Sequence, residues 1–457
     1  MRTHLSGFRG VSVLPDAVFR HPLAYARRMV LDSSQEELAA LIRRAGQQRR
    51  VKKTVSEWER GREPDDTAQE LIAVVFKVPD DQRVGIPWPL WLPAPDLPEL
   101  YEPWTAAGTV AVLDTVLRSG RMDRRQFVIL SGVTLTKVLH DWLTTQPDMA
   151  HAVTGEGRRI PASMVNRIAG RITDLQRDDD THGGGDLIFE VEALLSLVHH
   201  YLSKNSPDET QRARLWAQAA DLGRMAGWMR FDNGQHAAAQ RHFTGALRAA
   251  HTSGDVLLGA NVLAFAAVQH YSVGNPADAD NMVRTAQTAV RGRSTPVVDA
   301  MLAARQARAL AKAGDARSCF HALNRAHDLL DQGSHEADPP WAYWVQRPEV
   351  DMLTGSCMLD LGRPADAQRH FSRADAAYGP EYVRTHVLYL SRMATAQLQQ
   401  RQVDAACAST SQALTLAADV HSGRGSDHVR DAVKQLLPYR REPAVRDLLD
   451  RAKAATT

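Results

Sequence analysis

The amino-acid sequence predicts an all-α protein in which a small N-terminal domain precedes a long array of helical repeats. Hydrophobic residues make up 44% of the 457-residue chain but aromatic residues only 6%. Alanine, leucine and arginine are plentiful, which favours helices over β-strands. Two short helical patterns flank a group of cations between residues 33 and 64, and a spaced pattern of small and apolar residues recurs through the C-terminal half. This length allows more than one domain.

Residues 33–64 have the pattern of two short helices joined by a basic segment. Ser34 can cap the first helix, and Glu36 and Glu37 follow it, where acidic side chains suit the positive end of the helix dipole. The second helix, TVSEWERG, ends at Gly61, and Pro64 just beyond it acts as a stop signal. The sequence therefore predicts a helix–turn–helix arrangement.

The basic segment carries six cations and no acidic residue: Arg43, Arg44, Arg49, Arg50, Lys52 and Lys53. Because the net charge of the chain is only +2, any nucleic-acid surface must be local, and this segment is the densest candidate. A pair of helices with cations just before the second helix is the arrangement by which a protein places a helix in the DNA major groove. We expect the last four of these cations to anchor phosphates and read bases.

The motifs SQEELA and TVSEWERG resemble the helix-turn-helix of the phage-repressor-like (Xre) family of bacterial DNA-binding domains, over residues 23–84. The resemblance implies that Gln35 contacts a phosphate and that Arg28 and Glu59 form a buried ion pair. It implies base contacts near the start of the second helix, from Lys52, Lys53, Thr54 and Glu57. The interval between the two motifs is longer than in the family, which predicts either an extended helix or a loop there.

Changes in composition mark the expected domain boundaries. We expect a mobile arm at 1–20, a helix-turn-helix domain at 21–85, a Pro/Trp-rich strap at 86–104, a helical linker and start of the solenoid at 105–205, repeats at 206–425 and capping helices at 426–457. Six prolines exclude a helix or a central strand from the strap. We favour a strap packed between domains, and the alternative is an arm that docks on another surface or protomer.

A repeated pattern fills the C-terminal half: a glycine, a small residue five positions later, a large apolar residue nine later and an alanine twelve later. The turn positions are Gly234, Gly274, Gly314, Gly362 and, in a degenerate copy, Arg401, at intervals of 40, 40, 48 and 39 residues. Each unit reads as helix, turn, helix. The signature resembles the tetratricopeptide repeat with a longer period, which implies helix pairs stacked into a superhelix with a concave groove.

The inward face of each first helix predicts a ligand or partner site in that groove. Its candidate residues, mapped by repeat position, are Arg224, Trp228, Asp232, Asn261, Tyr271, Arg305, Arg308 and Lys312. The three cations of the third unit suit a carboxylate, a phosphate or the C-terminus of a peptide. The alternative is a concave surface that is merely solvated.

Catalysis is not expected from this sequence. No zinc-protease, serine-hydrolase, Walker or zinc-finger spacing occurs, so we expect no metal and no cofactor. Three widely spaced cysteines suit reduced thiols and not a disulfide framework. No apolar run is long enough to span a membrane, and the N-terminus lacks a signal-peptide core. We therefore expect a cytoplasmic protein.

The phrases MDRRQFVILSG, HGGGDL, AGWMRFDNGQHAAAQRHF and LGRPADA extend the resemblance over nearly the whole chain. It resembles actinobacterial transcriptional regulators that join a helix-turn-helix domain to tetratricopeptide-like repeats and are associated with development and secondary metabolism. The resemblance implies a homodimer that binds double-stranded DNA, with repeats that sense a small molecule, peptide or protein. The alternative is an interaction scaffold or anti-regulator in which DNA binding is secondary.

Overall fold

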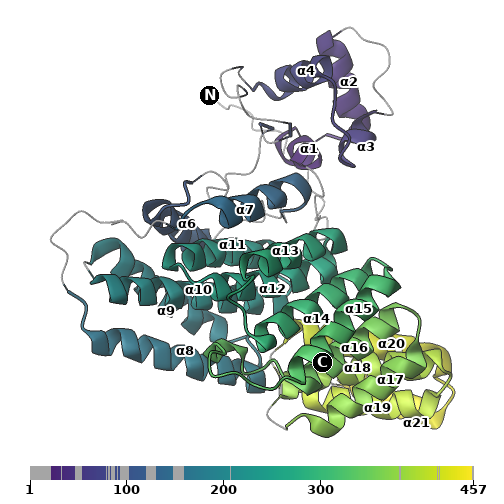
Figure 1. Cartoon of the computed structure of the whole chain (residues 1–457). Coiled ribbons are helices and arrows are strands. Elements are labelled where there is room, and N and C mark those ends of the chain that lie inside the picture. The colour runs from purple at the N-terminus through teal and green to yellow at the C-terminus, as the bar shows by residue number, and fades with distance from the viewer. Residues whose placement is uncertain are drawn as a thin grey trace, which may run out of the picture. The chain divides into compact units, whose positions relative to one another are not determined.

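The computed structural model describes residues 22–31, 33–46, 54–78, 80, 83, 88–89, 91–92, 102–119, 130–147, 159–205, 207–379, 382–418, 420 and 422–454. The chain divides into two compact units, Met1–Pro95 with Asp123–Leu130, and Asp96–Met122 with Ser131–Thr457. Throughout the described ranges every regular element is helical, so the predicted all-α class is confirmed. Figure 1 shows the small unit in purple and the large unit from blue to yellow.

The N-terminal unit is built from four short helices around one apolar core. They are α1 (Pro22–Tyr25), continued by the π-helical turn η1 (Ala26–Val30), α2 (Gln35–Gly46), α3 (Thr54–Trp58) and α4 (Asp66–Phe76). The predicted cap of α2 is present: the Glu37 amide donates to Ser34 Oγ at 3.2 Å, and the Ser34 amide donates to the Glu37 carboxylate at 2.6 Å. This reciprocal arrangement satisfies backbone donors that the first helical turn leaves free.

The large unit consists of longer helices, which pair consecutively after the first four. They are α6 (Ala106–Ser119), α7 (Gly132–Thr144), α8 (Ala162–His182), α9 (Leu187–Lys204), α10 (Glu209–Asp232), α11 (His236–Ser253), α12 (Val256–Val273), α13 (Pro276–Ala289), α14 (Pro296–Lys312), α15 (Ala316–Leu330), η3 (Pro340–Ala342), α16 (Arg347–Asp360), α17 (Pro364–Ala377), α18 (Val383–Gln399), α19 (Val403–Ala417), α20 (Gly423–Leu436), η4 (Leu437–Tyr439) and α21 (Pro443–Ala454).

The predicted turns lie between the helices of successive pairs, from α10–α11 to α18–α19. Gly234 and Gly362 have φ values of 75° and 72°, and Arg401 in the degenerate copy has a φ of 61°. A positive φ costs glycine little, so glycine is the default residue at such turns. Arg401 therefore adopts the same turn against its own preference, and the fifth copy is a repeat in structure as well as in sequence.

The small residues of the pattern lie where the paired helices touch. A Cβ added to Gly227 on α10 would lie 2.7 Å from a ring carbon of Phe243 on α11, and one added to Gly355 on α16 would lie 2.8 Å from the equivalent carbon of Phe371 on α17. Both phenylalanines occupy the large apolar position of the repeat. The two pairs thus use the same packing, a glycine on the first helix that accommodates an aromatic ring from the second.

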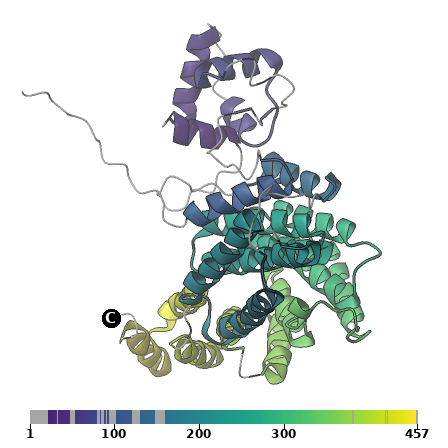
Figure 2. The same cartoon turned by 90° about the vertical axis from the view of Figure 1, so that its left-hand side faces the viewer.

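The array of the large unit returns upon itself. Helix α20 packs against α10, and α18 packs against α8; Figure 2 shows the C-terminal helices in yellow beside the teal helices of this unit. Arg424 on α20 and Asp232 on α10 form a 3.1 Å ion pair across 192 positions of sequence. Arg384 on α18 and Asp179 on α8 form another at 3.0 Å. These contacts enclose the concave face of the superhelix.

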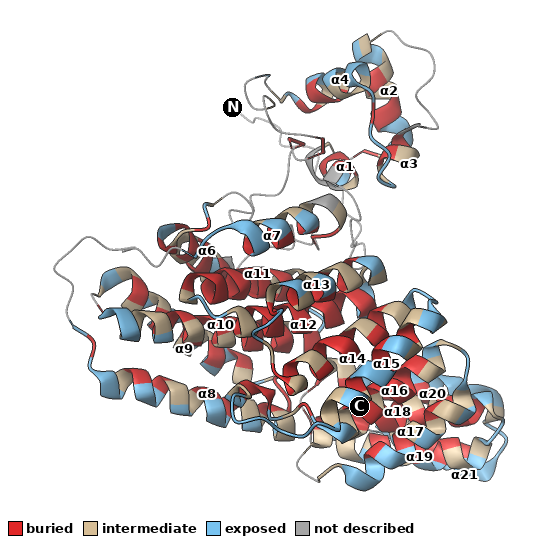
Figure 3. Cartoon of the chain, in the orientation of Figure 1, coloured by how far each residue is buried: buried red, intermediate tan, exposed pale blue. Residues whose placement is uncertain are grey.

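Helices α10, α11 and α12 are buried over most of their length, whereas helices such as α17, α19 and α21 expose one face (Figure 3). Helix α12 is also long and apolar enough to cross a membrane by length and composition, but 78% of that window is buried inside the protein. A helix that is apolar on every side suits the interior of a large domain equally well.

The segment predicted to be a strap packs by its tryptophans. Trp88 and Trp91 belong to the apolar core of the N-terminal unit, together with Leu23, Leu38 and Ile72. Trp104, at the other end of the segment, packs within the large unit, where its ring lies 4.5 Å from the Arg248 guanidinium carbon. All three indoles therefore pack against other residues of this chain.

Candidate functional site

A central cavity of about 360 Å³ lies in the large unit, on the concave face of the repeats. Its wall comes from α8 and from the first helix of each successive pair: α10, α12, α14, α16, α18 and α20. Residues of the long insertion between α15 and α16, Trp341, Tyr343 and Trp344, complete the wall. A volume of this size suits a small molecule or the end of a peptide.

Most of the residues predicted for the groove line this cavity. They are Arg224, Trp228, Asp232, Tyr271, Arg305, Arg308 and Lys312. Inward positions could be placed by repeat register because consecutive inward residues of a helix recur every three or four positions. Asn261 is the exception. It is buried on α12, one turn before the lining residue Phe265, and lies outside the cavity wall.

Arginines and aromatic rings alternate along the wall. The guanidinium of Arg424 lies 4.7 Å from the ring centre of Trp228, and that of Arg384 lies 5.2 Å from the same ring. The guanidinium of Arg308 lies 5.4 Å from the ring of Tyr271. Such cation–π contacts hold the arginine planes in place and shield part of their charge.

Carboxylates pair with most of the lining cations. Arg308 and Lys312 share Asp360, at 2.6 and 3.0 Å, and Arg424 pairs with Asp232 at 3.1 Å. Arg392 on α18 also lines the cavity, but it forms no hydrogen bond or ion pair with any described residue. Burial lowers the pKa of Arg392 to about 10, and repulsion from Arg308 adds to this effect. The site therefore holds a cation without a direct ion-pair partner, and Asp360, which Arg308 and Lys312 share, acts on it only at longer range.

Two further groups show how strongly the wall is desolvated. Burial lowers the pKa of His428 to about 3, helped by the charges of Arg392 and Arg424. On the α8 side, burial raises the pKa of Asp179 to about 6, against the opposing effect of Arg384. His428 is therefore neutral near pH 7, whereas Asp179 changes charge only slightly below that pH.

Buried donors in the wall also lack partners. The indole Nε1 of Trp228 and the Nε of Arg305 have no hydrogen-bond partner among the described residues, and the two residues are 8% and 6% exposed. An unpaired buried donor costs about 1–3 kcal/mol, so native proteins rarely leave one without a functional reason. Both N–H groups belong to residues that line the cavity.

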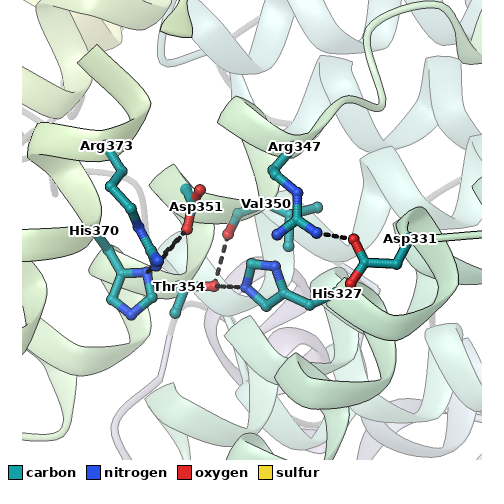
Figure 4. A network of polar contacts seen from close by, with 8 residues as sticks. All are labelled: His327, Asp331, Arg347, Val350, Asp351, Thr354, His370 and Arg373. Carbon is teal, nitrogen blue, oxygen red and sulfur yellow. Dashed lines mark hydrogen bonds and ion pairs between the residues drawn. The ribbon is translucent and has the colours of Figure 1, made fainter. Parts of the chain in front are cut away.

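A second polar network joins α15, α16 and α17 on the other face of α16 (Figure 4). His327 contacts the Thr354 hydroxyl at 3.1 Å, and Asp351 accepts from Arg373 at 2.9 Å and contacts His370 at 3.0 Å. Most of these groups pair with one another, although the Nδ1 of His327 has no partner among the described residues. The network joins α16 to α15 and α17.

In the N-terminal unit, the residues predicted to contact DNA lie around α2 and α3. Gln35 begins α2, and its amide donates to the Glu59 carboxylate at 2.5 Å. Thr54 begins α3, and Glu57 pairs with the exposed Arg62 at 2.7 Å. Arg49, Arg50, Lys52 and Lys53, and with them the path of the lengthened turn, lie outside the described residues.

The buried ion pair of this unit differs from the prediction by one position. Arg27, and not Arg28, pairs with Glu59, at 2.6 Å, and its guanidinium also donates to the Ser33 carbonyl at 2.6 Å. Arg28 is exposed. The helix widens into a π-helical turn at Ala26–Val30, and because such a turn holds extra residues, the side that faces Glu59 shifts along the sequence.

The described residues contain no cluster of three or more His, Cys, Asp or Glu side chains that could hold a metal ion. Cys319, Cys357 and Cys407 are buried free thiols. Cys319 occupies the small-residue position of its repeat, as the sequence indicated. Packing accounts for its place in the fold.

Comparison of the chain with known proteins finds similarity only among solved structures. No protein-family model matches it, and no curated protein does. Among solved structures, a Rap protein complexed with competence and sporulation factor shares 10% identity, with a TM-score of 0.39, over 64% of this chain and 98% of that one. The Cut9–Hcn1 hetero-tetramer of APC/C shares 12% identity, with a TM-score of 0.33, over 90% of this chain and 69% of that one. Likenesses this distant identify neither a ligand nor a partner.

Proposed function

We propose that this protein is a binding module whose repeat unit captures a small anionic ligand, or the anionic end of a partner, in its central cavity. The observation that carries the proposal is the combination, in one enclosed site, of an unpaired cation with unpaired buried donors. Arg392 forms no direct ion pair with a described residue, and Trp228 and Arg305 each keep an unsatisfied N–H group. A ligand that supplies negative charge and acceptors would satisfy all three.

The aromatic anion anilinonaphthalene sulfonate is a direct probe of this proposal. We expect saturable binding at one site, reported by its fluorescence, and weaker binding to Arg392→Gln. Arg446→Gln, which removes an exposed cation of α21, serves as the matched control and should bind as the wild type does. Absence of saturable binding, or equal binding by Arg392→Gln, would contradict the cavity as the site.

The N-terminal unit favours DNA binding as a second function. Its supporting observation is the packing of α2, α3 and α4 about one core, with Arg27 and Gln35 both joined to Glu59. This arrangement would hold the start of α3 in a fixed position relative to α2. With both functions the protein would be a cytoplasmic transcriptional regulator, controlled through its repeats and acting as a homodimer, since one such unit covers few base pairs.

The DNA-binding proposal is tested by removing Lys52 and Lys53 together. In a gel-shift assay on DNA selected by the wild-type protein, Lys52→Ala with Lys53→Ala should abolish sequence preference. Arg430→Ala with Lys434→Ala removes the same charge from α20 and should leave the preference unchanged. Affinity should also fall with salt, by about 0.9 in the log–log slope for each phosphate neutralised. Unchanged specific binding by the Lys52/Lys53 variant would refute the assignment.

The interaction-scaffold alternative makes a different prediction for the cell. If the repeats act alone, a chain lacking residues 1–85 should retain the effect of the whole protein on gene expression. If the protein is a DNA-binding regulator, that deletion should abolish the effect while the cavity still binds anilinonaphthalene sulfonate.

A further inference from the structure

One corner of the cavity has an excess of positive charge. Arg308, Lys312, Arg392 and Arg424 act together on the His428 side chain, which places all four near one point of the wall. Asp360 and Asp232 are the carboxylates paired with these cations. Asp427 also lines the cavity, but it is exposed and pairs with Arg430 outside this group. Four cations and two carboxylates leave an excess of two positive charges.

The size of this excess distinguishes between classes of anion. A carboxylate brings one negative charge, whereas a phosphate monoester brings about 1.5–2 at pH 7 and three acceptor oxygens. Guanidinium groups bind phosphate through parallel N–H donors, and lysine adds a point charge. Arg308, Arg392 and Lys312 supply both kinds of donor. The corner therefore matches a dianionic phosphate better than a single carboxylate.

The rest of the cavity is lined by aromatic rings on which a planar ring can stack. Trp228, Phe265 and Trp344 follow one another edge to face, with ring centres 5.1 and 5.6 Å apart. The unpaired indole N–H of Trp228 and the unpaired Nε–H of Arg305 lie in the same wall. A ligand without acceptor atoms would leave these donors unsatisfied. A planar ring that carries nitrogen or oxygen acceptors would both stack on the aromatic groups and accept from them.

We propose that the cavity binds a small phosphate monoester joined to a planar heteroaromatic ring, the chemistry of a nucleoside monophosphate. The phosphate occupies the corner formed by Arg308, Lys312 and Arg392, and the ring lies against Trp228 and its aromatic neighbours. The cavity volume of about 360 Å³ favours a free small molecule over a phosphorylated protein segment. This inference rests on the ligand-binding function proposed above.

The experiment measures displacement of anilinonaphthalene sulfonate from the full-length protein by the monophosphates of adenosine, guanosine, cytidine and uridine. The best of these is compared with its own nucleoside, with inorganic phosphate and with indole-3-acetate, an aromatic monocarboxylate. We expect the monophosphate to bind at least about tenfold more tightly than each of the three, because only it combines the dianion with the ring.

Arg392→Gln should weaken the best monophosphate at least about tenfold and leave its nucleoside nearly unchanged, since Arg392 is assigned to the phosphate. This variant should fold, because it removes a desolvated charge, and its melting temperature verifies that. Arg446→Gln is the control. Equal affinity for the nucleoside or for indole-3-acetate would overturn the phosphate assignment, as would failure of all four monophosphates to displace the probe. The binding function itself fails only if the probe does not bind saturably.

Discussion

The two units of this protein use arginine in opposite ways. In the N-terminal unit one arginine is committed to structure: Arg27 joins Glu59 and a backbone carbonyl beside an apolar core. In the repeat unit, arginines line a cavity, and Arg392 has no partner there. The difference indicates where binding energy is available. A fully paired buried charge contributes little to recognition, whereas an unpaired charge in an enclosed site can be satisfied by a ligand.

The largest change in stability is expected from substitution of Arg27. Arg27→Ala leaves the nearly buried Glu59 carboxylate without its counter-ion and with only the Gln35 amide as a donor, which should destabilise the N-terminal unit by about 3–5 kcal/mol. Arg28→Ala, at the exposed neighbour, is the control and should change stability little. Hydrogen exchange of the α2 and α3 amides measures the effect. If Arg28→Ala were the more damaging, the assignment of the pair would be wrong.

In the repeat unit, a comparable test concerns the packing that holds the cavity in shape. Gly227→Ala would place a methyl group 2.7 Å from the Phe243 ring and should destabilise the unit by about 1–3 kcal/mol through overpacking. Gly170→Ala, on α8 with no atom within 4 Å of the new Cβ, should instead stabilise the protein by about 0.5–1 kcal/mol, because alanine favours a helix over glycine. Thermal unfolding of both variants shows the opposite signs.

Asp179 gives the stability of the repeat unit a dependence on pH. Burial raises the pKa of Asp179 from its ordinary value of 3.8 to about 6. The native state therefore binds this proton more tightly than the unfolded chain does. Its contribution to stability is thus fully present below pH 3.8 and is lost as the pH rises through 6. Relative to the wild type, Asp179→Asn should gain about 1–2 kcal/mol between pH 4 and pH 7. Denaturant unfolding at both pH values measures this gain, and Asp427→Asn is the exposed control.

The smallest expected effect is at the exposed pair of Glu57 and Arg62. Glu57→Gln should change stability by less than about 1 kcal/mol, because water screens a pair of this exposure. If the start of α3 faces DNA, the same change should increase affinity for any duplex, since it removes a negative charge from that surface. Fluorescence anisotropy with labelled DNA tests this. An unchanged affinity would place Glu57 away from the DNA.

Much of the cavity could be predicted from repeat register, and Arg392, which was missed, follows the same rule. Arg305 lies nine positions before Gly314, and Arg392 lies nine positions before Arg401, the degenerate turn of the last copy. Applying the inward positions to that copy would have identified Arg392. Repeat register does not predict Asp179, because this residue lies on α8, before the first repeat. Its place in the wall depends on α18 packing back against α8.

The N-terminal unit shows where local pattern is insufficient. The Ser34 cap and the core positions Leu38 and Ile72 follow from residue type and spacing alone. The partner of Glu59 does not, because Arg27 and Arg28 are adjacent and chemically identical. The π-helical turn determines which of the two arginines faces Glu59. Whether that turn forms depends on the packing around it.

By itself, the sequence determined the all-α class, the helix–turn–helix pairs of the repeats and the inward residues of their first helices. These properties depend on neighbours within one or two helical turns, so spacing along the chain is sufficient to reveal them. Only the tertiary structure decided that the superhelix closes, and therefore which charges meet. Arg424 and Asp232 are 192 positions apart. Small rotations at each helix pair accumulate along the array. Their sum brings α20 into contact with α10 and leaves Arg392 without a direct ion-pair partner.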